Sequence, residues 1–316
     1  MRARVVRGSR NVFTLRPESE RPGEGRNEFE CRIKGKILKG VEGYYNPLAP
    51  GDIVETEGGL ITGLVKRKNT FARFNQKGQA PQLLAANVDL VACLTTAHSP
   101  PFRPRFIDRV LFQAEYSNIQ AVLVCNKLDL GEEGPDTAGR LEGFKRIGYP
   151  VFRVSALSGE GMEQFRSFIA GKFLVLTGHS GVGKSSLIKA LNPALEIKTG
   201  ALNEKYKRGN HTTTQSALLD FPVNDESNMR SSIIDTPGIR RFAPERVPVS
   251  DVILYMREFA PLAGKCGFGL SCTHEAEPGC KIMEAVNAGA IHKDRYESFL
   301  RIRDEMAGVE RYPDYD

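Results

Sequence analysis

The stretch Gly178-His179-Ser180-Gly181-Val182-Gly183-Lys184-Ser185 matches the phosphate-binding pattern G-x-x-x-x-G-K-S at every position. Residues 172–177 before it are apolar and predict a strand, and residues 184–191 after it predict a helix with one apolar side. The backbone N–H groups of such a loop turn inward on a bound anion, and the helix N-terminus adds the positive end of its dipole. Strand, motif and helix together favour a phosphate loop over a glycine-rich turn without a ligand.

The last residues of this loop have predictable roles. We expect Lys184 to reach the terminal phosphates of a nucleotide, as a catalytic group, and Ser185 to ligate Mg²⁺. The nucleotide-binding residues expected in this segment are Gly178, His179, Ser180, Gly181, Val182, Gly183, Lys184, Ser185 and Ser186.

A second motif, Asn126-Lys127-Leu128-Asp129, comes about fifty residues before the phosphate loop. Residues 119–125 predict a buried strand, so the motif lies at a carboxyl end, where open α/β sheets bind ligands. Asp129 can accept hydrogen bonds from guanine N1–H and the exocyclic amine, which adenine does not offer. We expect the stem of Lys127 to lie over the base and Asn126 to tie the two loops together. The N-K-x-D pattern alone is common in solvated loops, but beside a phosphate loop it indicates guanine recognition.

Two further segments complete a GTPase set in an unusual order. Residues 151–154 predict a strand, and Ser155-Ala156 after it predict the loop that backs the guanine. Asp235-Thr236-Pro237-Gly238 follows an apolar pair, which suits an acid that holds Mg²⁺ through water and a Gly238 amide that senses the terminal phosphate. Ordinary small GTPases place the phosphate loop first, so this order indicates a circular permutation. The permuted order also connects the segment after Gly238 directly to the C-terminal region. Through this short covalent link, sensing of the terminal phosphate would move a whole domain.

Residues 209–214 form a polar, threonine-rich segment between the phosphate loop and Asp235. A mobile loop here is expected to supply a threonine to Mg²⁺, and Thr212, Thr213 and Thr214 are all candidates. We favour Thr214, which lies nearest the strand predicted at 217–221. Judged from these residues alone, a threonine-rich loop without a ligand fits as well. The position of the segment between the phosphate loop and Asp235 favours a loop that ligates Mg²⁺.

Ile239 occupies the position where Ras-like enzymes place the glutamine that orients the attacking water. Isoleucine forms no hydrogen bond, so we expect slow hydrolysis unless another group or a partner completes the site. His211 is the candidate catalytic residue in this segment, because imidazole can orient or deprotonate water. A loop histidine with no catalytic role fits the sequence equally.

Cys266, Cys272, His274 and Cys280 form the pattern C-x₅-C-x-H-x₅-C, with glycine and proline between them. Three thiolates and one imidazole satisfy tetrahedral Zn²⁺ with no open position, so a single structural zinc site is predicted. Disulfides are the alternative, but the sequence shows no signal peptide and hence no sign of an oxidising compartment. The remaining cysteines, which are Cys31, Cys93 and Cys125, lie in apolar contexts and are expected in the core.

The organisation follows from these motifs. Residues 1–75 contain short strands broken by glycine and proline and predict an OB-fold-like barrel. A polar link at 75–81 leads to alternating strands and helices at 82–242, which predict an α/β GTPase domain. Residues 243–316 predict a mainly helical domain that binds zinc.

The 316 residues carry a net charge of +6, and no apolar segment is long enough for a membrane span. We therefore expect a monomeric cytoplasmic protein without a membrane partner. A basic face on the barrel is predicted to contact nucleic acid, although an ordinary solvated surface also fits. The residues of that face are Arg32, Lys34, Lys36, Lys39, Lys66, Arg67 and Lys68.

The permuted motifs, the preceding barrel and the following Cys/Cys/His/Cys set closely resemble the RsgA (YjeQ) family of bacterial small-ribosomal-subunit biogenesis GTPases. The resemblance covers essentially the whole chain. It implies GTP and GDP as ligands, Mg²⁺ and Zn²⁺ as cofactors, and the small ribosomal subunit with its rRNA as partner. It further implies slow hydrolysis stimulated by the subunit during late assembly, with assembly factors as further candidate partners.

Two other classes of function remain open from the sequence alone. An ATP-using P-loop enzyme acting on a small molecule is opposed by residues 126–129, and comparing GTP with ATP affinity separates the two. A nucleotide-gated RNA-binding module in which hydrolysis is incidental is the other. A His211→Ala variant that loses turnover but keeps assembly function would favour that module.

Overall fold

The computed structural model describes residues 1–9, 11–19, 27–33, 43–193, 216–222, 230–239 and 242–309. Its first five strands close into a barrel with the order β1-β2-β3-β5-β4. The β3–β5 pair is parallel and the other pairs are antiparallel, which is the arrangement of an OB-fold. The predicted barrel is confirmed. The strands are β1 (Arg2–Ser9), β2 (Val12–Pro17), β3 (Phe29–Ile33), β4 (Ile53–Glu57) and β5 (Leu60–Leu64).

Alternation along these strands explains the barrel. Val5, Phe13, Leu15, Val54 and Ile61 point inward and are almost fully buried. Many of their neighbours along the strands, such as Arg4, Arg16 and Glu55, are polar and more exposed, as a closed sheet with one packed interior requires. Cys31 lies in this interior, as expected for a core cysteine.

An antiparallel hairpin of β6 (Thr70–Asn75) and β7 (Ala80–Ala86) follows the barrel. Residues 75–81, which the sequence suggests as a polar link, form its turn instead. Gln79 at the turn has a φ of 47°, so the polar composition reflects a tight reversal and not an extended connection. Phe71 from this hairpin is buried against the central domain.

The central domain contains a six-stranded sheet with the order β10-β9-β8-β11-β13-β12. All strands are parallel except β12, which runs antiparallel to β13 at the edge. The inner strands are apolar on both faces, as expected for a parallel sheet covered twice. Their bounds are β8 (Leu90–Thr96), β9 (Gln120–Asn126), β10 (Val151–Arg153), β11 (Phe173–Gly178), β12 (Ala217–Pro222) and β13 (Arg230–Asp235).

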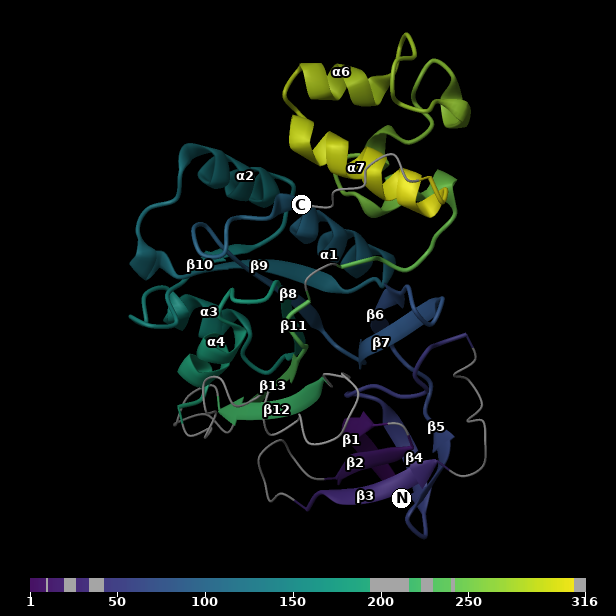
Figure 1. Cartoon of the computed structure of the whole chain (residues 1–316), viewed down its shortest axis with the longest axis vertical. Coiled ribbons are helices and arrows are strands. Elements are labelled where there is room, and N and C mark those ends of the chain that lie inside the picture. The colour runs from purple at the N-terminus through teal and green to yellow at the C-terminus, as the bar shows by residue number, and fades with distance from the viewer. Residues whose placement is uncertain are drawn as a thin grey trace.

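Helices cover the two faces of the sheet (Figure 1). The helices α1 (Pro104–Tyr116) and α2 (Pro135–Arg146) pack on one face, and their apolar residues share a core with Val91 and Val175. The opposite face carries α3 (Met162–Phe168) and α4 (Lys184–Leu191), which bury Phe165 and Leu187. A short 3₁₀ turn, η1 (Leu128–Leu130), follows β9. This is the α/β layering that the alternation of elements predicts.

The C-terminal region is mainly helical, as predicted. It contains η2 (Val249–Tyr255), η3 (Ala260–Leu262), η4 (Gly269–Ser271), α6 (Lys281–Asn287) and α7 (Lys293–Met306). Its core surrounds Phe259 and Phe299, whose rings stack with centroids 4.9 Å apart, and includes Phe112 from α1. This domain therefore shares part of its core with the GTPase domain.

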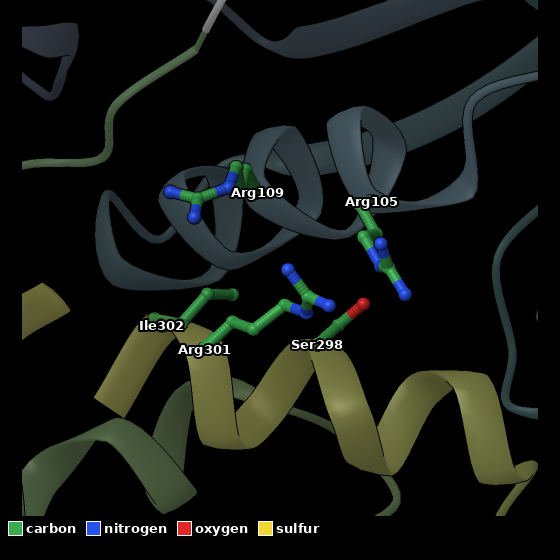
Figure 2. A pocket seen from close by; sticks show the side chains of 5 residues that line it. All are labelled: Arg105, Arg109, Ser298, Arg301 and Ile302. Atoms are coloured by element: carbon green, nitrogen blue, oxygen red, sulfur yellow. The ribbon is translucent and has the colours of Figure 1, made fainter. Parts of the chain in front are cut away.

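Ion pairs also join α7 to the GTPase domain. Asp108 of α1 is fully buried and accepts hydrogen bonds from Arg140 of α2 and from Arg295 and Ser298 of α7. Figure 2 shows the adjoining space between α1 and α7, into which arginine side chains from both of these helices project. Within the described ranges, no helix is long and apolar enough to cross a membrane.

Candidate functional site

The phosphate loop turns between β11 and α4. Gly181 and Gly183 have φ values of 87° and 93°, which non-glycine residues rarely adopt, so the glycines of the motif are needed where they stand. The Lys184 side chain is buried and donates hydrogen bonds to the carbonyl oxygens of Gly178 (2.9 Å) and His179 (3.2 Å). The cation is therefore held across the mouth of the loop, where the motif predicts nucleotide phosphates.

Asp235 ends β13, next to β11, and its side chain faces the phosphate loop. Its Oδ1 atom is buried without a hydrogen-bond partner, an arrangement that a ligand at this point would relieve. Burial raises the pKa of Asp235 to about 6, although the nearby Lys184 ammonium opposes the shift. Burial likewise lowers the pKa of Lys184, against the attraction of Asp235. Burial therefore favours the neutral forms of both groups, and their mutual attraction opposes it.

Gly238 lies against the phosphate loop, as its expected role requires. A Cβ atom added to Gly238 would lie 3.2 Å from Ser180 Cα and 3.5 Å from Lys184 Nζ. A side chain here would therefore fill the space beside the lysine ammonium.

The guanine motif is tied to the phosphate loop by Asn126. Its Nδ2 donates to Val182 O (3.0 Å), and its Oδ1 accepts from Ala156 N (3.0 Å). One buried side chain thus links three loops at the same edge of the sheet. A Cβ atom at Gly183 would lie 2.4 Å from Asn126 Nδ2, so glycine is also required there by close packing.

Asp129 and Lys127 take up positions that suit base recognition. Ser155 donates to Asp129 Oδ1 at 2.5 Å and accepts from Ser158 N at 3.0 Å, which fixes the carboxylate in place. Lys127 has a left-handed φ of 71°, and its Nζ donates to Ser99 O at 2.6 Å. The predicted acceptor for guanine is therefore held in one orientation by Ser155.

The loop after β8 is a part of the site that the sequence analysis missed. Ser99 bonds Lys127, and a Cβ atom at Gly181 would lie 3.6 Å from Pro100 Cδ. This loop therefore borders both the guanine motif and the phosphate loop. The signal that could have identified this loop is its position after a buried strand beside β11, at the edge where ligands bind in open α/β sheets.

Ile239 is 4% exposed and packs in the core with Phe71, Phe106 and Phe242. Its backbone N–H donates to Gly178 O at 3.4 Å. The side chain is therefore turned away from the nucleotide side and offers nothing to an attacking water. The predicted catalytic His211 and magnesium ligand Thr214, with Thr212 and Thr213, lie outside the described residues.

The four predicted zinc ligands meet in the C-terminal domain. The ligand atoms of Cys266, Cys272, His274 and Cys280 all lie within 4.8 Å of one another, and all four residues are buried. His274 Nδ1 is 3.5 Å from the sulfur atoms of both Cys266 and Cys280. In addition, Lys281 N and Met283 N point at sulfur atoms, at 3.3 and 3.5 Å. Backbone donors at sulfur favour thiolates, so this donor set fits a tetrahedral zinc ion.

Contacts around the cluster hold its turns in place. Tyr296 of α7 donates to His274 O at 2.7 Å, and His274 itself has a φ of 62°. The Glu277 carboxylate accepts from Thr273 N (2.6 Å) and Glu275 N (3.0 Å). The Thr273 hydroxyl also donates to this carboxylate, and this hydrogen bond, more than those from the backbone, lowers the pKa of Glu277 to about 2.

The basic face predicted on the barrel is reduced in the structure. Arg67 is not part of a solvated face, because its guanidinium binds Asp52 Oδ1 (2.7 Å) and Oδ2 (2.8 Å) and Pro47 O (3.0 Å). Lys68 is exposed but pairs with Asp89 at 2.8 Å. Arg32 and Lys66 are exposed, as predicted, and Lys34, Lys36 and Lys39 lie outside the described residues.

Comparison with known proteins bears on this arrangement. The model of the family described as RsgA GTPase matches residues 64–245, more than half of the chain. A protein from Porphyromonas gingivalis named small ribosomal subunit biogenesis GTPase RsgA is 38% identical over 300 residues, which cover 91% of this chain and 93% of the relative. A relative of the same name from Flavobacterium johnsoniae is 36% identical over 285 residues, covering 86% and 85% of the two chains.

Solved structures agree in fold. The crystal structure of YjeQ from Thermotoga maritima matches with a TM-score of 0.69 at 29% identity, over 98% of this chain and 99% of the other. YloQ, described as a circularly permuted GTPase, matches with a TM-score of 0.63 at 22% identity, over 99% and 96% of the two chains. At that identity the second likeness supports the fold alone.

Proposed function

The chain belongs to the RsgA family of GTPases and hydrolyses GTP, and from that premise we propose that it acts on the small ribosomal subunit during late maturation. In this proposal it binds the subunit and its rRNA in the cytoplasm, and subunit binding stimulates turnover. The relatives that it matches carry the name of small ribosomal subunit biogenesis GTPases.

One observation carries the assignment of guanine and phosphate roles. Asn126 joins the guanine motif, the Ala156 loop and the phosphate loop through two hydrogen bonds of 3.0 Å. The permuted chain thereby brings together the segments that an unpermuted GTPase brings together. Asp129 is the acceptor for guanine, Lys184 faces the terminal phosphates, and Gly238 senses them.

The residues that would hold Mg²⁺ are Ser185, Asp235 through water, and Thr214. Bound Mg²⁺ would neutralise charge on the phosphates as the bond to the leaving group breaks. The buried and unpartnered Oδ1 of Asp235 supports this assignment. Zn²⁺ is assigned a structural role at Cys266, Cys272, His274 and Cys280, where no ligand position is open to a substrate.

Slow turnover of the isolated protein follows from Ile239. Its side chain lies in the core and cannot orient water, so the position that other GTPases use is lost to catalysis. We assign water positioning to His211, in a geometry completed by the ribosomal subunit. The net charge of +6 and the exposed Arg32 and Lys66 support an anionic partner such as rRNA.

The deciding experiment is GTP hydrolysis by the purified protein with and without purified small subunits. Large subunits and ATP serve as controls. Stimulation of about tenfold or more by small subunits alone, with no use of ATP, is the expected result. An unchanged slow rate in the presence of small subunits would remove the subunit from the mechanism, and equal use of ATP would overturn guanine recognition.

A His211→Ala variant tests the assignment of the base. The stimulated rate should fall by about 10²-fold or more while the affinity for GTP is kept, because a positioned acid or base contributes about that much. A variant with wild-type stimulated turnover would exclude His211 from catalysis.

A further inference from the structure

The barrel contacts the hairpin of β12 and β13, which leads to Asp235. Strand β12 begins three residues after Thr214, and its partner β13 ends at Asp235, at the start of the phosphate-sensing segment. Within the sheet β12 pairs only with β13, because it is the edge strand. Figure 1 shows the barrel lying against this edge strand, and β1 packs on β12.

One ion pair makes this contact specific. Arg16 of β2 donates to the carboxylate of Asp220 on β12, across 204 residues of chain. Both side chains are largely buried, with exposures of 12% for Arg16 and 8% for Asp220. Arg16 is also bound to Glu28 of the barrel at 3.1 Å, so its guanidinium is anchored on the barrel side.

Asp220 is equally anchored on the GTPase side. Its Oδ1 accepts from Ser232 Oγ at 2.5 Å, and Asp220 and Ser232 are direct partners in the register of β12 and β13. Its carbonyl oxygen accepts from Asn192, the residue after α4, at 3.4 Å. A single carboxylate therefore ties the barrel to both strands of the hairpin, and its backbone reaches the end of the phosphate-loop helix.

We infer that the Arg16–Asp220 pair positions β13 and the segment that begins at Asp235, and communicates the state of the barrel to the nucleotide site. Strand β13 leads from this point to Asp235 beside the phosphate loop, so a shift of the barrel on β12 is transmitted through the paired β13 to that residue. A buried ion pair suits the task, because its geometry is held by several hydrogen bonds and breaking it is costly. The part that concerns the ribosomal subunit rests on the proposed function; the positioning part does not.

Two arms test this inference with Arg16→Gln, Asp220→Asn and the double variant. Arg7→Gln is the matched control, because Arg7 also faces Glu28 from the barrel (3.8 Å) but does not contact Asp220. In the first arm, release of a fluorescent GDP from the isolated proteins is measured with Mg²⁺ present. Release should be about tenfold faster in both single variants and unchanged in Arg7→Gln. The double variant should release no faster than the single variants, because all three lose the same bond.

The second arm measures GTP turnover against the concentration of small subunits. Arg16→Gln should lower the rate at saturating subunits about tenfold, while the half-saturating concentration of subunits stays within about twofold of wild type. A merely structural defect would instead also raise the half-saturating concentration of subunits. Thermal unfolding checks that each variant folds, and Asp220→Asn provides the test if Arg16→Gln does not.

The outcomes separate the two proposals. GDP release at the wild-type rate in folded Arg16→Gln and Asp220→Asn, or equal acceleration in Arg7→Gln, overturns the positioning role, whatever the subunit does. Faster GDP release in a protein that subunits do not stimulate keeps the positioning role and removes the proposed partner. Full stimulation of Arg16→Gln at saturating subunits overturns the communication between barrel and site.

Discussion

Ser155 holds Asp129 in place by donating a hydrogen bond to its carboxylate at 2.5 Å. An Asp129→Asn variant replaces an acceptor with an amide that can also donate. Guanine N1–H and the exocyclic amine then lose their charged acceptor, and GTP affinity should fall by about 10²-fold, the cost of one or two charge-assisted hydrogen bonds. Xanthine presents a carbonyl oxygen where guanine has the amine, so xanthosine triphosphate should bind the variant more tightly than GTP. Competition against a fluorescent nucleotide measures both affinities.

Asn126→Ala is the control for this reversal of specificity. It removes the link to Val182 and Ala156 without touching the base-recognition carboxylate. GTP and xanthosine triphosphate should both bind more weakly, with their ratio as in the wild type. An Asp129→Asn protein that still prefers GTP would contradict the assignment of Asp129.

Glu245 is a second residue with a predictable effect, in this case on stability. It is 8% exposed, and Gln113 of α1 holds it by donating to its carboxylate (2.9 Å) and accepting from its N–H (2.8 Å). Burial raises the pKa of this carboxyl, against the hydrogen bond from Gln113, which lowers it. A raised pKa means that the folded state binds the proton more tightly, so the free energy of unfolding falls as the pH rises above the ordinary glutamate pKa.

Glu245→Gln keeps the acceptor for Gln113 and removes the buried charge. The variant should unfold at a temperature about 2 °C or more above wild type at pH 7. Near pH 4 the advantage should disappear, because the wild-type carboxyl is then protonated in both states. Calorimetry at the two pH values measures the difference. A variant less stable than wild type at pH 7 would show that the carboxylate is stabilising as a charge.

At this scale the sequence predicts the residues whose chemistry is local. The phosphate loop and residues 126–129 are recognisable because nucleotide binding demands particular residue types at fixed spacing. The Gln113–Glu245 and Arg16–Asp220 pairs were not predicted, because each joins segments more than 100 residues apart. Arg67 was assigned to a basic face that contacts nucleic acid, although Asp52, only 15 residues away, binds its guanidinium, because a charge run does not show which member has a buried partner.

The loop before α6 carries the four predicted zinc ligands, and its folding is expected to depend on the metal. It contains few regular hydrogen bonds and is held by four side chains around one point. The wild-type protein should carry about one zinc ion per chain, and Cys280→Ser about none, because a structural site needs all four ligands. Metal analysis by mass spectrometry gives the stoichiometry.

Removal of zinc should unfold the loop around the cluster and leave the nucleotide site intact. Trypsin should then cut at Lys265 and Lys281, which flank the cluster, while GTP affinity changes by less than about twofold, since the nucleotide site is built on another domain. Cys31→Ala, in the barrel, is the control and should keep its zinc. Retention of one zinc ion by Cys280→Ser would refute the predicted ligand set.

Elements were predicted where periodicity and a motif coincide. The strand at 172–177 and the helix at 184–191 were predicted nearly to the residue, and they are β11 and α4. The hairpin of β6 and β7 was missed, because its turn is polar and resembles a linker. The antiparallel direction of β12 was also not predicted, since strand direction depends on the tertiary path of the chain and not on its local pattern.

For the whole molecule, the docking of the C-terminal domain rests on Asp108. This carboxylate is fully buried and holds Arg140 and Arg295, which have side-chain exposures of 6% and 4%. Asp108→Asn removes the charge that two buried guanidinium groups share, although Arg140 keeps Asp294 and Arg295 keeps Glu258, and should reduce the free energy of unfolding by about 1.5–3 kcal/mol. Chemical denaturation should show the C-terminal domain separating in a transition of its own.

Glu297→Gln is the matched control at the same interface. Glu297 pairs with Arg105 at 3.1 Å but is 41% exposed, so its loss should cost less than about 1 kcal/mol. If Asp108→Asn is no less stable than Glu297→Gln, the buried cluster does not determine how the domains dock.

The connection from Gly238 to the C-terminal domain is anchored along its way. Phe242 is buried in the central core, Ala243 O accepts from Phe74 N at 2.8 Å, and Glu245 is clamped by Gln113. The sequence suggests a short covalent link by which phosphate sensing moves a domain. With these anchors, movement of the C-terminal domain requires the clamp at Gln113 and the Asp108 cluster to open as well.

The strand order β10-β9-β8-β11-β13-β12 also determines which part of the sheet has been synthesised at each stage of translation. A nascent chain that has reached residue 160 already contains β8, β9 and β10 together with the whole guanine motif. The edge of β8 that later pairs with β11 is then open, and an unpaired strand edge is a site for mispairing. GTP cannot assist this first half of the sheet to fold, because its phosphate-binding segment has not yet been synthesised.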